Sequence, residues 1–219
     1  MASYTEENYL KALYNLSNAQ GEVSISDLAN SLKVSMPTAN SMVKSLQKSD
    51  WAVYEKYKPV MLTPKGKKEA ALIVRKHRLT EMFLVKKMGF GWQEVHEVAE
   101  QIEHIHAPKF FERMDEMLGY PTVDPHGSPI PDHQGRIQKM SYTSLSSCKA
   151  GQIVQLTALT NSSTEFLKFL NSRKLALGTQ LNVLSREAYD HSLVVSYDQH
   201  PQETLSEKVS ERLLVRVLE

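Results

Sequence analysis

Apolar side chains recur at helical spacing in the first part of the chain. One stripe consists of Tyr9, Leu10, Leu13 and Leu16. Because residues three and four apart share a helix face, this stripe predicts a helix, which Gly21 would end. A second, short helix is expected over residues 27–32, with Ser26 as its N-cap.

A third helix is predicted after a break at Lys33 and Val34. Ser35 can cap this helix, and Pro37 would lie in its first turn, where a missing N–H costs little. Its inward face would carry Ala39, Met42, Val43 and Leu46. Two helices joined by a tight turn are the outline of a DNA-reading motif.

The hydrophobic period changes from helical to alternating at Trp51. Residues 51–57 alternate as a strand does, a Lys-Pro pair turns, and residues 60–62 return. A new helix is expected to begin at Pro64. The order of these elements matters, because three-helix cores are common, whereas a basic hairpin that directly follows one indicates a wing.

Further helices are predicted over residues 64–88, 92–106 and 107–118, and residues 121–135 are rich in Pro and Gly, which predicts an irregular connection. Short strands with one helix near residues 163–172 predict a small barrel, the strands being 152–159, 180–184, 192–197 and 213–218. We therefore expect an α+β chain made of a winged helix-turn-helix domain (1–74), an all-helical domain (75–135), a linker (136–148) and a small β domain (149–219).

Composition excludes several classes of protein. The 219 residues are 41% hydrophobic and 23% charged, as in ordinary globular proteins. The sequence contains no long apolar run, so we expect no membrane span. It has no basic, apolar leader, so we expect no signal peptide. A single cysteine, Cys148, suits a reducing cytoplasm. The chain is mildly basic up to residue 75 and acidic over residues 76–132, which fits a DNA-contacting head and a cation-binding middle.

Histidine and glutamate recur on the predicted helices of the middle segment. His77 and Glu81 are i, i+4, and a second stripe contains His96, Glu100, Glu103 and His104. Two such stripes could converge on Mn²⁺, Fe²⁺ or Zn²⁺. The second stripe could equally be the solvated side of a helix whose apolar face carries Val95, Val98, Ala99, Ile102 and Ile105. The remaining histidines are interpreted as surface or loop residues, namely His106, His126, His133, His191 and His200.

Three ordered segments carry a family resemblance: RKHRLTE at 75–81, VHEVAEQIEH at 95–104 and GSPIP at 127–131. Together they resemble the diphtheria toxin repressor family of iron- and manganese-dependent regulators. The wing, with YEKY at 54–57, is similar to the manganese branch. The resemblance covers nearly the whole chain, because the iron branch also ends in an SH3-like β domain.

The resemblance implies two metal sites. The primary site would fall on Asn8, Glu100, Glu103 and His104, joined by His77 in the manganese branch. The ancillary site would fall on His77, Glu81 and His96, with help from Ser162 and Glu165 of the β domain. A cysteine stands at the position of Glu100 in iron-type members, so its carboxylate favours Mn²⁺.

The chain departs from the family pattern at the implied primary site. Asn8 stands where the manganese branch has aspartate and the iron branch methionine, and Lys11 stands where the manganese branch has glutamate. An ammonium there would repel a metal ion and could pair with Glu100 or Glu103. Our hypothesis is that Lys11 weakens or partly replaces the primary metal, which makes the ancillary site the better candidate.

The recognition helix is expected to present Ser35, Pro37, Thr38, Asn40, Ser41, Lys44, Ser45 and Lys48 to DNA. No arginine is available there to read guanine, so affinity should come from phosphate contacts by Lys44, Lys48, Lys56 and Lys58. Any one of these lysines taken alone is typical of a solvated surface charge.

The resemblance implies a repressor that binds a double-stranded DNA operator as a homodimer when Mn²⁺ or Fe²⁺ (Zn²⁺ being a further possibility) is bound, with no small-molecule substrate. The dimer would use residues 92–118, although the apolar side chains there could instead form core: Phe110, Phe111, Met114 and Met117. One alternative is a structural or self-assembling protein on the same fold that has lost metal-gated repression, which Asn8, Lys11 and the near-neutral charge favour. A metal-dependent hydrolase is disfavoured by the lack of a nucleophile elbow, a His-Glu-x-x-His motif and a P-loop.

Overall fold

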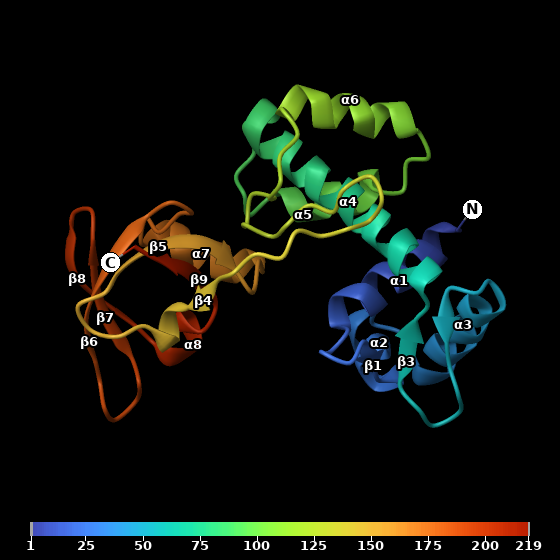
Figure 1. Cartoon of the computed structure of the whole chain (residues 1–219), viewed down its shortest axis with the longest axis horizontal. Helices are drawn as coiled ribbons and strands as arrows, with labels where there is room; N and C mark the ends of the chain where they lie inside the picture. The colour runs from blue at the N-terminus through green and yellow to red at the C-terminus, as the bar shows by residue number, and fades with distance from the viewer. Residues whose placement is uncertain (1, 219) are drawn as a thin grey trace. The chain divides into compact units, whose positions relative to one another are not determined.

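A computed structural model describes residues 2–218, which fall into two compact units (Figure 1). The first unit comprises Met1–Thr80, Glu97–Thr122 and Ile130–Gln138. The second comprises Glu81–His96, Val123–Pro129 and Lys139–Glu219. Each unit therefore combines segments that are distant in the sequence, and each contains one group of the metal-ligand candidates.

The N-terminal part of the first unit is a helix bundle with a small sheet (Figure 1). Its helices are α1 (Tyr4–Leu16), α2 (Ile25–Ser31) and α3 (Met36–Lys48). The antiparallel sheet has the order β1-β3-β2, formed by Glu22–Val23, Val60–Leu62 and Ala52–Val53. A helix-turn-helix followed by a hairpin is the winged arrangement that the sequence predicts, so this prediction is confirmed.

Serine side chains fix where these three helices begin. The hydroxyls of Ser3, Ser24 and Ser35 each accept a hydrogen bond from the backbone N–H three residues later. The prediction that Ser26 caps the second helix is wrong, because α2 begins two residues earlier than expected and Ser24 takes that role.

The wing is shorter than its alternating pattern suggests. The strand predicted over residues 51–57 pairs only at Ala52–Val53. Tyr57 has a φ of 67°, a left-handed conformation that belongs to a turn and ends the ladder. The turn leaves the Tyr57 side chain 90% exposed, between two exposed lysines.

The head has its own apolar core. Leu10, Leu13, Leu28 and Leu46 are fully buried and belong to one cluster. Burying a leucine contributes about 1.5–3 kcal/mol, so this cluster holds α3 firmly on the head. Leu16 is 37% exposed, and the predicted stripe therefore ends one turn before the helix does.

Three helices follow the wing: α4 (Pro64–Met88), α5 (Val95–Ile102) and α6 (Pro108–Leu118). The bounds of α4 match the prediction, and α6 differs by one residue. The helix predicted over 92–106 is confined to α5, because residues 92–94 form a turn. Gly119 ends α6 in the left-handed conformation, as a C-cap glycine does.

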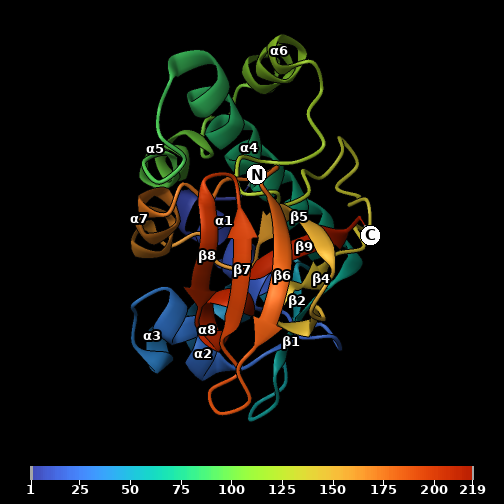
Figure 2. The same ribbon diagram turned by 90° about the vertical axis from the view of Figure 1, so that its left-hand side faces the viewer.

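The C-terminal domain is a six-stranded antiparallel sheet with the order β4-β9-β5-β6-β7-β8 (Figure 2). The strands are β4 (Thr143–Ser144), β5 (Ile153–Leu159), β6 (Gln180–Arg186), β7 (Leu193–Tyr197), β8 (His200–Leu205) and β9 (Leu213–Val217). Three short helical segments accompany them: η1 (Leu145–Ser147), α7 (Thr164–Ser172) and α8 (Glu207–Ser210). A single core of leucine, valine and phenylalanine side chains lies beneath the sheet. The predicted α+β class with a small C-terminal β domain is confirmed.

Two strands of the C-terminal domain were not expected from the sequence. β8 is polar and contains a proline, so it carries no alternating apolar signal, yet it pairs with β7 at the edge of the sheet. β4 lies within the predicted linker 136–148 and pairs with β9. Among residues 2–218, no helix has the length and hydropathy needed to cross a lipid bilayer.

Candidate functional site

The recognition helix presents a short polar face. Ser35, Pro37, Thr38, Ser41, Lys44 and Lys48 are exposed, whereas Asn40 and Ser45 are half-buried. The Ser35 hydroxyl is within 2.8 Å of the Thr38 hydroxyl, so these two side chains order the first turn of α3. The exposed face of α3 is therefore polar at its start and basic towards its end.

A hollow of about 540 Å³ separates the start of α3 from the wing. Its lining includes Pro37 and Asn40 of the helix and Tyr54, Lys56 and Lys58 of the wing. Lys58 Nζ lies 2.6 Å from Glu55 Oε2, but both side chains are well exposed, so this pair contributes little and can yield to another anion. The hollow has the basic and aromatic lining that suits a nucleic-acid backbone.

The side chain of Lys11 brings α1 and α5 together within the first unit. Its Nζ lies 2.5 Å from Glu100 Oε1 and 2.6 Å from Glu103 Oε1. Glu103 is completely buried, and its Oε2 lies 2.5 Å from His77 Nδ1 on α4. We call these four residues, Lys11, His77, Glu100 and Glu103, the Lys11 cluster.

Glu103 is ionised in this setting. Burial alone would raise the pKa of its carboxyl group, but the hydrogen bond from His77 and the charge of Lys11 outweigh burial and lower that pKa. The Lys11 cluster is thus a group of buried and half-buried side chains whose charges compensate one another.

A histidine just after α5, His104, is held by a carboxylate of α1. His104 Nδ1 lies 2.5 Å from Glu7 Oε2, and Glu7 is also 3.7 Å from Lys76 Nζ. Buried Asn8 Oδ1 and His104 Nε2 form no hydrogen bond within residues 2–218. Glu7 was not identified by sequence reasoning, although its place on α1 beside Asn8 was a usable signal.

The Lys11 cluster does not fit the metal that the sequence resemblance implies there. A divalent ion would need Glu100 and Glu103 as its charged ligands, and both already contact the ammonium of Lys11. Two unit charges about 4 Å apart interact by about 4 kcal/mol at a protein surface, and a divalent ion would be repelled about twice as strongly. The other donors of the implied site, Asn8, His77 and His104, would be neutral ligands and would bring no charge to offset that repulsion.

A second group of ligand atoms lies in the second unit. One atom each of Glu81, Asp124 and His126 lies within 4.8 Å of the other two, and all three residues are buried. We call these residues the Glu81 trio. Two carboxylates and one imidazole form a donor set typical of Mn²⁺ and Fe²⁺, with no thiolate to favour structural zinc. The residues of the Glu81 trio fit a divalent metal.

The backbone sets the orientation of the His126 ring. His126 Nε2 donates to the carbonyl oxygen of Trp92 at 2.9 Å, which leaves Nδ1 facing Glu81 Oε2 at 3.7 Å. A ring that donates from one nitrogen presents the lone pair of the other to a metal. Burial lowers the pKa of His126, but the hydrogen bond and charge of Glu81 and the charge of Asp124 raise it overall.

The sequence placed His126 at the surface or in a loop, and the placement at the surface is wrong. His126 lies in a loop, as its Pro- and Gly-rich segment predicts, but it is only 3% exposed. Its carbonyl accepts a hydrogen bond from Leu159 N on β5, and Asp124 Oδ1 accepts bonds from the backbone of His126 and Ser128. The signal available in the sequence was the pairing of two ligand types at Asp124 and His126.

The other predicted ligands are placed as follows. His96 Nδ1 lies 3.4 Å from Glu81 Oε1, and its side chain is 59% exposed, so His96 adjoins the Glu81 trio from the solvent side. His77 belongs to the Lys11 cluster rather than to this group. Ser162 and Glu165 are exposed at the start of α7, and their contribution to a metal site remains a prediction.

Gly127 allows the ligand loop to approach β5 closely. It has a φ of +84°, and a Cβ at this position would lie 2.3 Å from the carbonyl oxygen of Thr157. We expect Gly127→Ala to lower the free energy of unfolding by about 2 kcal/mol or more and to displace His126. Thermal unfolding and Mn²⁺ titration would measure both effects, with Gly178→Ala (φ +94° but open space) as the control for backbone strain alone. Equal effects of the two substitutions would contradict this role of Gly127.

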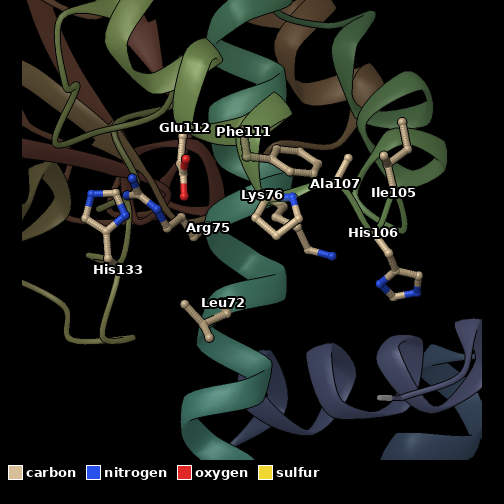
Figure 3. Close-up of a pocket in the computed structure, with 10 residues that line it drawn as sticks. Leu72, Arg75, Lys76, Ile105, His106, Ala107, Phe111, Glu112 and His133 are labelled. Carbon is tan, nitrogen blue, oxygen red and sulfur yellow. The ribbon is translucent and has the colours of Figure 1, made fainter.

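A hollow of about 350 Å³ in the first unit has a different character (Figure 3). Lys76 and Arg75 of α4 lie near Phe111 of α6, and Lys76 Nζ is 5.7 Å from the centre of the Phe111 ring. Arg75 pairs with Asp115 and donates to the Pro131 carbonyl. Arg75 and Lys76 place two cations in the lining of this hollow, and these cations disfavour a metal ion there.

Two family models match the chain, and both describe an iron-dependent repressor. Its N-terminal DNA-binding domain matches residues 1–60, and its metal-binding and dimerisation domain matches residues 63–132. The two matches together span more than half of the chain.

Individual relatives agree with these matches. The HTH-type transcriptional regulator MntR of Geobacillus thermodenitrificans (strain NG80-2) is 33% identical over 120 residues, which are 55% of this chain and 84% of that protein. The iron-dependent repressor IdeR of Mycobacterium leprae (strain TN) is 33% identical over 127 residues, 58% of this chain and 55% of that protein. A solved manganese-dependent transcriptional repressor in complex with manganese has a TM-score of 0.86 and 30% identity, covering 97% of this chain and 100% of its own. The manganese regulator SloR has a TM-score of 0.77 and 31% identity, covering 97% and 98%.

Proposed function

Because this chain belongs to the diphtheria toxin repressor family of iron-dependent repressors, we propose that it represses transcription by binding operator DNA as a homodimer when Mn²⁺ or Fe²⁺ occupies the Glu81 trio. The observation that carries the proposal is the buried trio of Glu81, Asp124 and His126 in a chain with a winged DNA-reading head. The regulator acts by binding rather than by catalysis, and we place its action in the cytoplasm, where operator DNA is found.

The donor set supports the choice of metal. Two of the three donors in the Glu81 trio are carboxylates, which favour harder ions, and the imidazole accommodates Fe²⁺ and Zn²⁺ as well. His96 adjoins Glu81 and can complete the coordination from the solvent side. Relatives with names that state manganese or iron dependence, and a solved relative with bound Zn²⁺, are consistent with this range. We favour Mn²⁺ as the activating ion.

Helix α4 supplies the connection between metal and DNA. It starts at Pro64, directly after the wing, and carries Glu81 more than four turns later. A metal ion that binds one position of α4 better than another shifts the protein towards that position by its difference in affinity. The population with the recognition helices correctly spaced for two half-sites would thereby increase.

The exposed apolar side chains of α6 support a homodimer. Phe110 is 44% and Met117 50% exposed, whereas Phe111 and Met114 are buried in the protomer. Phe110 and Met117 are seven residues apart and therefore share one helix face. We propose that a second copy of the chain covers this face.

Metal-stripped protein tested against fragments of its own genome would examine the proposed function. In a gel shift, we expect specific fragments to be retarded only after Mn²⁺ or Fe²⁺ is added. Specific binding both with and without metal would show that the protein recognises its operator but that metal does not control this recognition.

A second candidate is an assembly protein on the same fold, which the pairing of Lys11 with Glu100 and Glu103 favours. It predicts no specific fragment under either condition and oligomers larger than a dimer in gel filtration. A dimer that retards specific fragments would exclude it.

Substitution of the basic side chains of the head should weaken operator binding evenly across DNA sequences. We expect Lys44→Ala and Lys56→Ala each to reduce the slope of log K against log salt by about one, because each loses one phosphate contact. Binding measured between about 50 and 200 mM salt would give the slopes. Lys149→Ala, an exposed lysine of the β domain, is the matched control. Unchanged slopes for the head variants would place DNA elsewhere.

A further inference from the structure

We propose that the Lys11 ammonium is a built-in cation at the junction of α1 and α5. It holds the DNA-reading head on the dimerisation segment with no metal ion at that junction, so metal control passes to the Glu81 trio alone. This last clause rests on the proposed function.

The geometry of the Lys11 cluster carries the proposal. One ammonium contacts a carboxylate oxygen of Glu100 at 2.5 Å and one of Glu103 at 2.6 Å, across 89 residues of sequence from Lys11 to Glu100. Bridging Glu100 of α5 and Glu103, directly after α5, to α1 is the task that a divalent cation would otherwise perform there.

Burial keeps the lysine in this position. Its side chain is 12% exposed, and that of Glu103 is completely buried. A buried carboxylate without a nearby cation is strongly destabilising, and Lys11 supplies that cation. A metal ion entering the junction would have to displace an ammonium that is already desolvated and paired, and the displaced charge would then repel it.

The ammonium also differs from a metal ion in being permanent. A bound ion leaves when its concentration falls, whereas Lys11 is covalently part of α1. The contact between α1 and α5 is therefore present whether or not metal is available. The structure assigns the junction a contact that does not depend on metal and leaves the response to metal to the second unit.

Counting Mn²⁺ ions bound per protomer tests this inference on the full-length protein. We would use equilibrium dialysis followed by metal analysis, for the unaltered protein, Lys11→Glu, Lys11→Met and His126→Ala. The expected result is one additional tightly bound Mn²⁺ per protomer in Lys11→Glu and in Lys11→Met, because each removes the ammonium and leaves both carboxylates as ligands. Lys149→Glu, which makes the same charge change on the exposed surface, should add none.

The arms of the experiment separate the inference from the proposed function. If neither Lys11 variant binds more Mn²⁺ than the unaltered protein, Lys11 does not exclude a metal and the inference is overturned. If His126→Ala binds as many ions as the unaltered protein, the metal assignment to the Glu81 trio fails, whatever the Lys11 variants show. Lys11→Met introduces no new charge, so it gives a result even if Lys11→Glu does not fold.

Discussion

Replacement of His126 by alanine is expected to abolish metal-dependent operator binding while leaving weak, salt-sensitive binding to any duplex. The substitution removes the only imidazole of the Glu81 trio, so that the trio keeps only its two carboxylates, Glu81 and Asp124. Loss of a residue that only supports a ligand typically costs about 10–100-fold in metal affinity. We expect the loss of a ligand itself to cost at least about 100-fold, and Mn²⁺ titration followed by operator binding would measure it.

His106→Ala is the control for this substitution, because His106 is exposed and lies outside both metal-ligand groups. It should leave Mn²⁺ affinity and operator binding unchanged. Metal-dependent binding that persists in His126→Ala at unchanged Mn²⁺ concentration would refute the assignment of the switch to the Glu81 trio.

Charges on the exposed face of α6 should separate the two protomers. We expect the double variant Phe110→Asp and Met117→Asp to be monomeric in gel filtration, because four carboxylates would then face one another across a symmetric interface. A dimer binds its second half-site as an intramolecular event, so the monomer should lose about 10²–10⁴-fold in operator affinity.

A charge-matched variant distinguishes this effect from a general change in charge. Lys109→Asp also lowers the net charge by two, at an exposed position about 100° around the same helix from Phe110, and it should stay dimeric. Both the oligomeric state and operator affinity should be measured with saturating Mn²⁺. A dimeric Phe110→Asp, Met117→Asp variant would show that another surface joins the protomers.

The helices and the wing could be predicted because their signals are local. Apolar spacing, serine caps and punctuating glycine or proline gave the bounds of α4 and the order helix-turn-helix, hairpin, helix. β8 could not be predicted in this way, since four of its six residues are polar and the segment becomes a strand only through pairing with β7. The wing strand was overestimated because alternation continued through Tyr57, which the backbone uses for the turn.

The candidate site also contains residues that local signals predict and residues that only the tertiary structure brings together. Helical spacing predicted His77 and Glu81 as metal ligands, and the resemblance identified Glu100, Glu103 and His104 as potential ligands. It also identified Lys11 as a possible competitor, and the structure gives that possibility a geometry. His126 was missed because its burial depends on β5, which lies more than 25 residues away in the sequence.

The hydrogen bond from Leu159 to the His126 carbonyl, and the fit of Gly127 against Thr157, have a consequence for the modular organisation of the chain. The loop that carries Asp124 and His126 packs directly against β5 of the β domain. The β domain is therefore needed to hold the loop that carries two of the proposed metal ligands. A truncation after residue 138 would keep Glu81, Asp124 and His126 in the sequence and still deprive them of the surface that shapes their loop.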